Sequence, residues 1–156
     1  PGTTMVFNSA QVPGEIMDLM VVNTKTLNDD PRFGKALVGA WYETMEHMLP
    51  GHPKRAEAIA AMAKIAGSTA KEFEAQLKTT AMFYKAADGA KFTRSPDVKK
   101  TMQYVVDFSF DHALYGAKAK DDVGIQYPDG TVQGSPKNIK LRFDATYMQL
   151  AAAGQL

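Results

Sequence analysis

The chain has 156 residues, of which 45% are apolar and 22% charged, values that are ordinary for one globular domain. Its net charge of +1 at pH 7 gives no electrostatic reason to expect nucleic acid or an anionic membrane as a partner. The sequence has no cysteine, which excludes a disulfide framework, and no apolar run reaches the roughly 18 residues of a membrane span.

The chain opens with a short apolar run, a polar loop and a second apolar run. Thr3–Phe7 is rich in β-forming residues and is predicted to be a strand, and Ser9–Glu15 is predicted to be a loop. Ile16–Asn23 is almost uninterruptedly apolar, with Asp18 inside it, which predicts a strand buried on both faces of a parallel sheet. Because the chain enters at once into a strand, without a leader, we expect it to be the later part of a longer protein.

A first helix is predicted to begin after Asp30, which acts as its N-cap, with Pro31 at the first helical position. It is expected to stop near Pro50-Gly51. Trp41 is predicted to be buried and Tyr42 half exposed. The residues expected on its buried face are Phe33, Leu37, Ala40, Trp41, Thr44 and Met48.

Three more helices are predicted in the middle of the chain. One runs from about residue 53 to 66 and ends at Gly67, with Ala56, Ile59, Ala60 and Ala63 inward. The capping box Thr69–Glu72 opens the next, which continues through Leu77 to an irregular stretch at Met82–Tyr84. Ser95–Asp97 starts the last, which reaches toward Leu114 with Val98, Met102, Val105, Val106 and Ser109 inward.

The character of the chain changes after Gly116. Val123–Tyr127 and Thr131–Gln133 are predicted to form a hairpin around the turn Pro128–Gly130. Ile139–Phe143 alternates as a strand, and Asp144 is expected to cap a last short helix that runs through Ala153. The fold class predicted is therefore α/β and mainly helical. A sheet with so few strands, one of them buried on both faces, lacks enough neighbours within the chain, so that further strands are expected upstream.

Polar residues around the first loop are the candidate ligand-binding groups. Asn8, Ser9 and Gln11 offer donors and acceptors, although an ordinary turn that satisfies its own backbone explains them equally well. Glu15 suits a cationic ligand, because a planar guanidinium pairs with a carboxylate through two hydrogen bonds, and a surface charge is the alternative. Asp18 needs a partner inside an apolar strand, and a structural acceptor is favoured slightly over a site acid.

Other chemistry-bearing residues have less specific patterns. Phe83 and Tyr84 could form an aromatic wall for a cation, or core packing. Asp107 and Asp111 lie one helical turn apart and are expected on an exposed helix face. No metal and no cofactor are predicted, because no phosphate-binding glycine motif occurs and no metal-ligand spacing joins the three histidines His47, His52 and His112.

Several segments, spread over nearly the whole chain, resemble one family. They are Val21–Leu37, Gly39–Tyr42, Gln76–Thr80, Met82–Tyr84, Phe92–Pro96, Phe108–His112 and Leu141–Tyr147. Together they resemble the C-terminal half of an ABC-transporter substrate-binding protein, of the kind that binds sulfonates, taurine, nitrate and thiamine precursors. Within that family the chain is most similar to the subgroup linked to urea transport and guanidine use.

The resemblance implies a periplasmic-binding-protein type II-like fold, with two α/β lobes around a ligand cleft. Residues 1–15 would be the end of the second lobe and the crossover loop, and residues 16–156 the C-terminal part of the first lobe, with the upstream half absent. It implies capture of a small nitrogen-rich solute by lobe closure, a membrane permease as partner, and a periplasmic or lipid-anchored extracytoplasmic location. The ligand-binding residues carried over are Asn8, Ser9, Gln11, Glu15 and Tyr84.

Other functions remain open. The same family includes sulfonate, taurine and nitrate binders, and an enzyme of thiamine-pyrimidine synthesis shares the fold. A ligand-sensing module fused to a signalling protein is a further alternative. The resemblance favours a binding protein without enzymatic activity.

Overall fold

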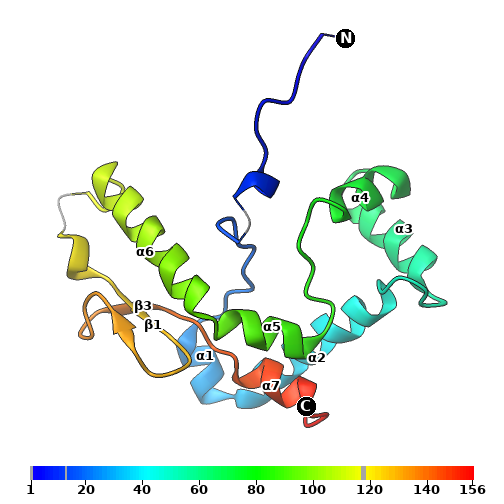
Figure 1. Ribbon diagram of the computed structural model, residues 1–156. Coiled ribbons are helices and arrows are strands. Elements are labelled where there is room, and N and C mark those ends of the chain that lie inside the picture. Colours follow the sequence, from blue (N-terminus) through cyan, green and yellow to red (C-terminus); the bar gives the residue numbers. More distant parts are fainter. Residues whose placement is uncertain (1, 13, 117–118) are drawn as a thin grey trace. The chain divides into compact units, whose positions relative to one another are not determined.

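The structure is a computed structural model that describes residues 2–12, 14–116 and 119–156. Figure 1 shows its elements in chain order. The helices are α1 (Thr24–Asp29), α2 (Pro31–His47), α3 (Arg55–Ile65), α4 (Ala70–Leu77), α5 (Ala86–Thr93), α6 (Pro96–Asp111) and α7 (Thr146–Ala152). The strands are β1 (Gly124–Gln126), β2 (Val132–Gln133) and β3 (Ile139–Arg142), and single turns of 3-10 helix occupy Ser9–Gln11 and Lys120–Asp122. The prediction of a mainly helical α/β chain is confirmed.

The chain divides into two compact units. The first contains Pro1–Met20 and Lys91–Ala145, and the second contains Val21–Ala90 and Thr146–Leu156. Each unit therefore combines segments that are far apart in the sequence. The division into lobes at residue 15 concerns the larger protein and stays a prediction.

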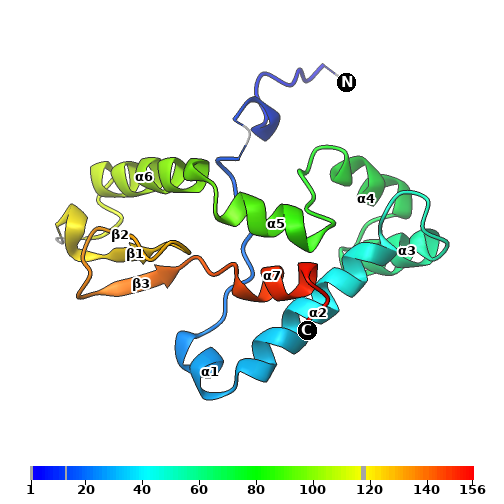
Figure 2. The ribbon, with the colours of Figure 1, turned by 60° about the horizontal axis from the view of Figure 1, so that its bottom comes forward.

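The three strands of the first unit form a small mixed sheet with β1 in the middle (Figure 2). β2 runs antiparallel to β1, with Ile125 opposite Gln133, which confirms the predicted hairpin. The Tyr127 N–H donates to the Thr131 carbonyl at 2.9 Å and closes the turn of the hairpin. Within this turn, Gly130 takes the left-handed conformation at φ 81°. β3 pairs with the other edge of β1 in parallel.

Two glycines allow the chain to pass from β2 to β3 across the start of β1. An added Cβ at Gly124 would lie 2.1 Å from the carbonyl oxygen of Ser135, and one at Gly134 would lie 2.2 Å from that of Val123. Both obstacles are backbone atoms and cannot swing away. The tight crossing therefore depends on the missing side chains.

Helix α6 covers the sheet and makes the core of the first unit. Its start was predicted correctly, with Pro96 in the first turn and Asp97 beside it. The core consists of Val98, Met102, Ile125, Tyr127 and Phe143. Of the residues predicted to point inward, Val98 and Met102 are buried, whereas Val105 is exposed.

The second unit is helical and centres on α2. Asp30 caps α2 as predicted, accepting a 3.0 Å hydrogen bond from the backbone of Arg32, whose side chain also lowers the pKa of the Asp30 carboxyl. Most of the predicted buried face was wrong, because Trp41 is 47% exposed and Phe33 is exposed too. Gly34, Val38 and Met45 are buried in the helix, whereas Met48 is buried and Tyr42 half-buried, both as predicted.

Helix α7 explains this change of face. It packs on α2 so closely that an added Cβ at Gly34 would lie 2.4 Å from the Tyr147 ring. The Lys35 ammonium donates to the Gln155 carbonyl at 3.1 Å just beyond α7. The predicted stripe satisfied helical periodicity equally well, and the close packing of α7 at Gly34 is one contact that favours the other face.

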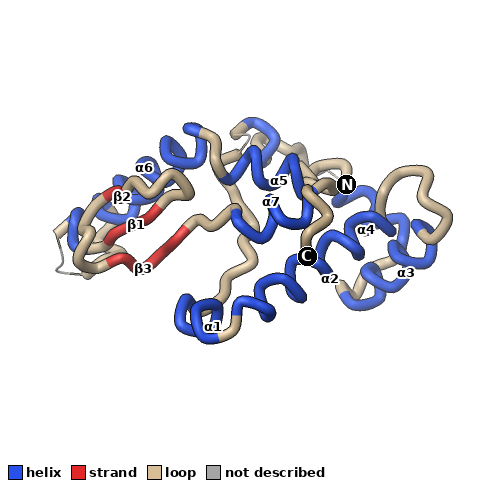
Figure 3. The backbone as a smooth tube through the Cα atoms, turned by 90° about the horizontal axis from the view of Figure 1, so that it is seen from below, coloured by secondary structure: helices blue, strands red, loops and turns tan. Residues whose placement is uncertain are grey.

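Helices α3 and α4 form a hairpin, which Figure 3 shows as two neighbouring helices. Gly67 ends α3 in the left-handed conformation at φ 66°, and the Thr69–Glu72 capping box opens α4, both as predicted. Ile59 and Ala63 are buried. An ion pair between Arg55 and Glu74 joins the two helices.

Helices α1 and α5 were not predicted. α1 has an Asn23 cap that accepts from the Lys25 N–H at 2.9 Å, a signal that lay inside the expected strand. α5 carries Gly89 in its middle, which lowers its intrinsic helix propensity. Packing supplies the reason for this glycine, since a Cβ there would lie 2.4 Å from the Tyr42 hydroxyl oxygen.

The two N-terminal strands were predicted wrongly. Thr3–Phe7 and Ile16–Asn23 contain no strand residue in the described structure, and most of their side chains are exposed. A strand forms only where another strand pairs its backbone, and no described segment does so for either. In the described residues no helix is both long and apolar enough to cross a bilayer.

Candidate functional site

The predicted ligand loop forms a self-contained turn. The Asn8 side chain accepts from the Ala10 N–H at 3.0 Å, and the Gln11 side chain accepts from the Asn8 N–H at 3.0 Å. These two bonds form a capping box around one turn of 3-10 helix. The alternative of a turn that satisfies its own backbone therefore describes Asn8 and Gln11, whose carbonyl oxygens are engaged. Ser9 is exposed.

The remaining predicted residues belong to both units. Glu15 follows Gly14, which has a φ of 80°, and is exposed. Asp18 is exposed as well, so the structural role favoured for it inside a buried strand does not occur in this segment. Tyr84 belongs to the second unit, where it is half-buried in the irregular stretch between α4 and α5. The ligand-binding roles of these residues stay predictions.

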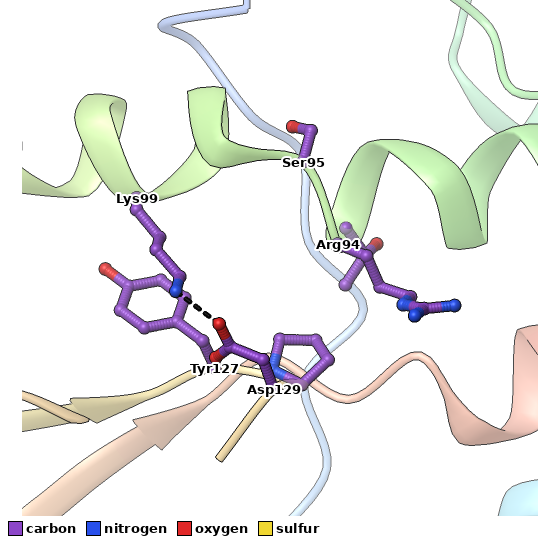
Figure 4. A pocket seen from close by; sticks show the side chains of 7 residues that line it. Arg94, Ser95, Lys99, Tyr127 and Asp129 are labelled. Atoms are coloured by element: carbon purple, nitrogen blue, oxygen red, sulfur yellow. Dashed lines mark hydrogen bonds and ion pairs between the residues drawn. The ribbon is translucent and has the colours of Figure 1, made fainter. Parts of the chain in front are cut away.

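A pocket lies in the first unit between the start of α6 and the turn of the hairpin (Figure 4). Its volume is about 100 Å³. The residues that line it are Thr93, Arg94, Ser95, Lys99, Tyr127, Pro128 and Asp129. Sequence reasoning placed several of these residues in a helix start and a turn, but did not bring the two segments together.

Lys99 and Asp129 form the charged centre of this pocket. The Lys99 ammonium lies 2.5 Å from an Asp129 carboxylate oxygen and 2.8 Å from the Thr131 hydroxyl. It also lies 5.3 Å from the centre of the Tyr127 ring. The hydrogen bond from Lys99, supported by two from Thr131, lowers the pKa of the Asp129 carboxyl to about 2.

Tyr127 begins a chain of polar contacts that leads away from the pocket. Its hydroxyl donates to the Gln133 side chain at 2.5 Å, and Gln133 donates to Gln103 on α6 at 3.0 Å. Gln103 in turn donates to Asp107 at 2.8 Å, and Asp107 pairs with Lys120. Burial raises the pKa of the Tyr127 hydroxyl. This series of contacts holds the hairpin to α6.

The residues of this pocket mainly stabilise the fold. Its one carboxylate and Lys99 neutralise each other, and pockets that hold small molecules are commonly several times larger. Arg94 is exposed and has no partner among the described residues. The Ser95 hydroxyl is buried without a hydrogen-bond partner in the described structure. The pocket has room for a water-sized group. The bonds of Lys99 to Asp129 and Thr131 join the hairpin to α6.

The histidines do not form a metal centre in the described residues. The His47 and His52 rings lie 5.0 Å apart, and the His52 Nδ1 atom accepts from the Lys54 N–H at 3.2 Å. No group of three His, Cys, Asp or Glu side chains in the described ranges is placed to hold a metal ion. His47 and His52 shape the turn between α2 and α3.

Comparison of the chain with protein-family models, with curated proteins and with solved structures gives no match. The structure itself defines an α/β chain that is mainly helical, with a small mixed sheet.

Proposed function

We propose that the chain is the later part of the solute-binding component of an ABC importer, with a periplasmic-binding-protein type II-like fold. The proposal is supported by the segments that resemble this family, which run from Val21–Leu37 to Leu141–Tyr147 and cover nearly the whole chain. In this proposal the binding protein stands outside the cytoplasmic membrane and delivers its solute to a permease. The solute is small and nitrogen-rich, of the urea or guanidine type.

The structural observation that supports the proposal best is the exposed apolar segment after the first loop. Ile16 is 71% exposed and Val21 is 73% exposed. Such exposure is expected where further structure covers the segment in the complete protein. A two-lobe protein of which this chain forms one part meets that expectation.

The mechanism is a shift of population between an open and a closed arrangement of lobes. The solute binds the closed arrangement more tightly and so increases its population. The permease then recognises the closed form. No bond is made or broken, and the binding free energy is used for closure and for selectivity.

Glu15 is the residue that would distinguish a guanidinium from a neutral solute. Its carboxylate is exposed and has no partner among the described residues, so it is available to a cation. A charge-assisted pair with a planar guanidinium is stronger than a neutral hydrogen bond. The ligand-binding roles predicted for Asn8, Ser9, Gln11 and Tyr84 are not needed for this distinction.

Calorimetric titration of the complete protein with guanidinium, urea, taurine and nitrate tests the proposal. We expect saturable binding of guanidinium or urea at one site. Glu15→Gln should weaken guanidinium binding about tenfold or more, because the charge-assisted bond is lost. Glu43→Gln, which changes an exposed carboxylate on α2, is the matched control and should leave the affinity unchanged.

Each other outcome replaces part of the proposal. Binding of taurine, an alkanesulfonate or nitrate in place of guanidinium and urea would change the ligand class and keep the transport role. Turnover of a thiamine precursor by the complete protein would replace the transport role with the enzyme. Absence of saturable binding to any of these solutes would contradict the proposal.

A further inference from the structure

Helix α6 has a partly apolar outer face, in addition to the inner face that fills the core of the first unit. Figure 2 shows α6 along one side of the small sheet, where Val98 and Met102 are buried. Away from that side, Tyr104 is 51% exposed and Phe108 is 58% exposed. Two large aromatic side chains one turn apart on the same helix form an exposed apolar surface of the kind that marks interaction sites.

Each of these two rings has a neighbour one helical turn away. The Lys100 ammonium lies 5.8 Å from the centre of the Tyr104 ring, and the His112 ring stacks on the Phe108 ring with 3.9 Å between the ring centres. Side chains whose positions are already restricted lose less conformational entropy when a partner covers them. The two rings are therefore suited to binding without rearrangement.

A base and an acid flank the two rings. Lys100, Tyr104, Phe108 and Asp111 follow one another at the spacing that places side chains on one face of a helix, and we call these four side chains the α6 patch. Lys100 and Asp111 are both exposed, and neither forms an ion pair with a described residue. Asp111 acts on Lys120 through its charge without a direct ion pair. Both charged groups are therefore available to a partner.

The order of the four residues in the α6 patch favours one partner. Reversing the order exchanges the base with the acid and one aromatic ring with the other. A second copy of α6 that runs antiparallel therefore places its Asp111 against Lys100 and its Phe108 against Tyr104. These two matches differ by one residue, about 1.5 Å along the helix axis, which a lysine side chain spans. A parallel copy would instead oppose lysine to lysine and aspartate to aspartate, which is unfavourable.

We infer that the α6 patch is the contact of a two-fold symmetric dimer, in which α6 of one copy packs antiparallel on α6 of a second copy. In such an interface the pair of Lys100 with Asp111 occurs twice. One helix of 16 residues from each copy makes a small interface, so we expect a weak dimer with a dissociation constant of about 10–100 μM. An anionic membrane or a nucleic acid fits less well, because Asp111 would repel it. The inference rests on α6 alone and is independent of the proposed function.

Reversing the charge at either end of the α6 patch tests this inference, with sedimentation equilibrium of the complete protein as the measurement. Lys100→Glu sets two carboxylates against each other at both ends of the dimer, and Asp111→Lys sets two ammonium groups against each other. Each variant alone should dimerise about tenfold more weakly or weaker still. An equimolar mixture of the two variants should restore the dissociation constant to within about threefold of the wild-type value, because every charge pair in the mixed dimer joins opposite charges.

Two substitutions outside the α6 patch are the matched controls. Lys71→Glu on α4 and Glu46→Lys in the last turn of α2 make the same changes of net charge at exposed positions. They should leave the dissociation constant unchanged, alone and mixed, and circular dichroism checks that every variant keeps its helices. The wild-type protein gives a second measurement that needs no variant, since raising NaCl from about 0.05 M to about 0.5 M should weaken its dimerisation by about threefold or more.

Other results of these measurements overturn the inference. A complete protein that stays monomeric up to about 1 mM would show that the α6 patch does not bind a second copy. Dimerisation of both single variants as tight as that of the wild type would place the interface elsewhere on the chain. Weakening by each variant without recovery in the mixture would exclude the antiparallel pairing of Lys100 with Asp111.

Discussion

Gly34 and Gly39 are two glycines on one helix that face different surroundings. A Cβ at Gly34 would lie 2.4 Å from the Tyr147 ring, whereas a Cβ at Gly39 would lie 3.5 Å from a Leu156 methyl group, an ordinary contact. Both positions lie inside α2, where alanine has the higher helix propensity. The difference between the two substitutions therefore measures the packing of α7 on α2.

We expect Gly34→Ala to destabilise the second unit by about 1–3 kcal/mol, because the added methyl group overpacks the contact with Tyr147. Gly39→Ala should be neutral, or stabilising by up to about 1 kcal/mol. Urea denaturation followed by the fluorescence of Trp41, the single tryptophan, reports on α2 directly. Equal stability of the two variants would contradict the close packing of α7.

Asp129 makes the stability of the hairpin dependent on pH. Its pKa is about 2, below the usual aspartate value of 3.8, because the hydrogen bonds from Lys99 and Thr131 favour the charged carboxylate. A lowered pKa in the folded state means that the contribution to stability is present above pH 3.8 and is lost as the pH falls toward about 2. Nuclear magnetic resonance of the Asp129 carboxyl carbon should show its midpoint in that range.

The Lys99→Met variant supplies the control for this titration. It removes the largest cause of the lowered pKa and retains much of the side-chain volume, so the Asp129 midpoint should rise toward 3.8. An unchanged midpoint would assign the effect to Thr131 alone.

Among the elements, the crossing from β2 to β3 depends on the backbone clearance at Gly124. Gly124→Ala should destabilise the sheet by about 3 kcal/mol or more, since the Cβ would meet the Ser135 carbonyl and neither backbone can yield easily. Gly130→Asn is the matched control in the hairpin turn, because asparagine tolerates the left-handed conformation and open space surrounds that position. Amide exchange at Ile125 distinguishes the two variants, and comparable exchange rates would contradict the crossing.

The two helix starts at Thr69 and Ser95 look alike in sequence and differ in structure. Thr69 makes a complete capping box with Glu72, whereas Ser95 makes no side-chain cap bond and its hydroxyl is buried without a described partner. Thr69→Ala should therefore cost about 1 kcal/mol, and Ser95→Ala should be neutral or slightly stabilising. Thermal unfolding followed by circular dichroism measures both, and a larger loss at Ser95 would contradict this assignment.

For the whole molecule, the exposed apolar residues predict the behaviour of the chain in isolation. Met5, Val6 and Phe7 are exposed in addition to the segment Ile16–Val22. We expect the 156-residue chain to bind a hydrophobic dye and to associate as its concentration rises. Sedimentation over a range of concentrations checks this, and a monodisperse monomer with one cooperative unfolding transition would contradict it.

The sequence predicted the elements whose signals are local. The Asp30 cap, the Thr69–Glu72 capping box, the α6 start at Pro96 and the Pro128–Gly130 turn were all placed correctly. Each of these depends on residues within a few positions of one another. The helices α1 and α5 were not predicted, because α1 begins inside an apolar run and α5 contains a central glycine.

The candidate site was less accessible to sequence reasoning. Asn8 and Gln11 were chosen as ligand groups, and the structure engages both in the backbone of their own turn. The contact of Lys99 with Asp129 joins residues from two distant elements, and local patterns cannot show such a contact. The Asp-Gly turn was the one available signal, since an aspartate at that position commonly bonds the backbone two residues later.

The sequence by itself determined where helices and turns begin and end, because caps, prolines and glycines act through the nearest backbone. Only the tertiary structure decided which face of α2 is buried, that β3 runs parallel beside β1, and that Ile16–Val22 forms no strand. These features depend on neighbours that are distant in the chain. Helical periodicity accommodated both stripes of α2, and a β-strand depends on a partner strand that local sequence does not reveal.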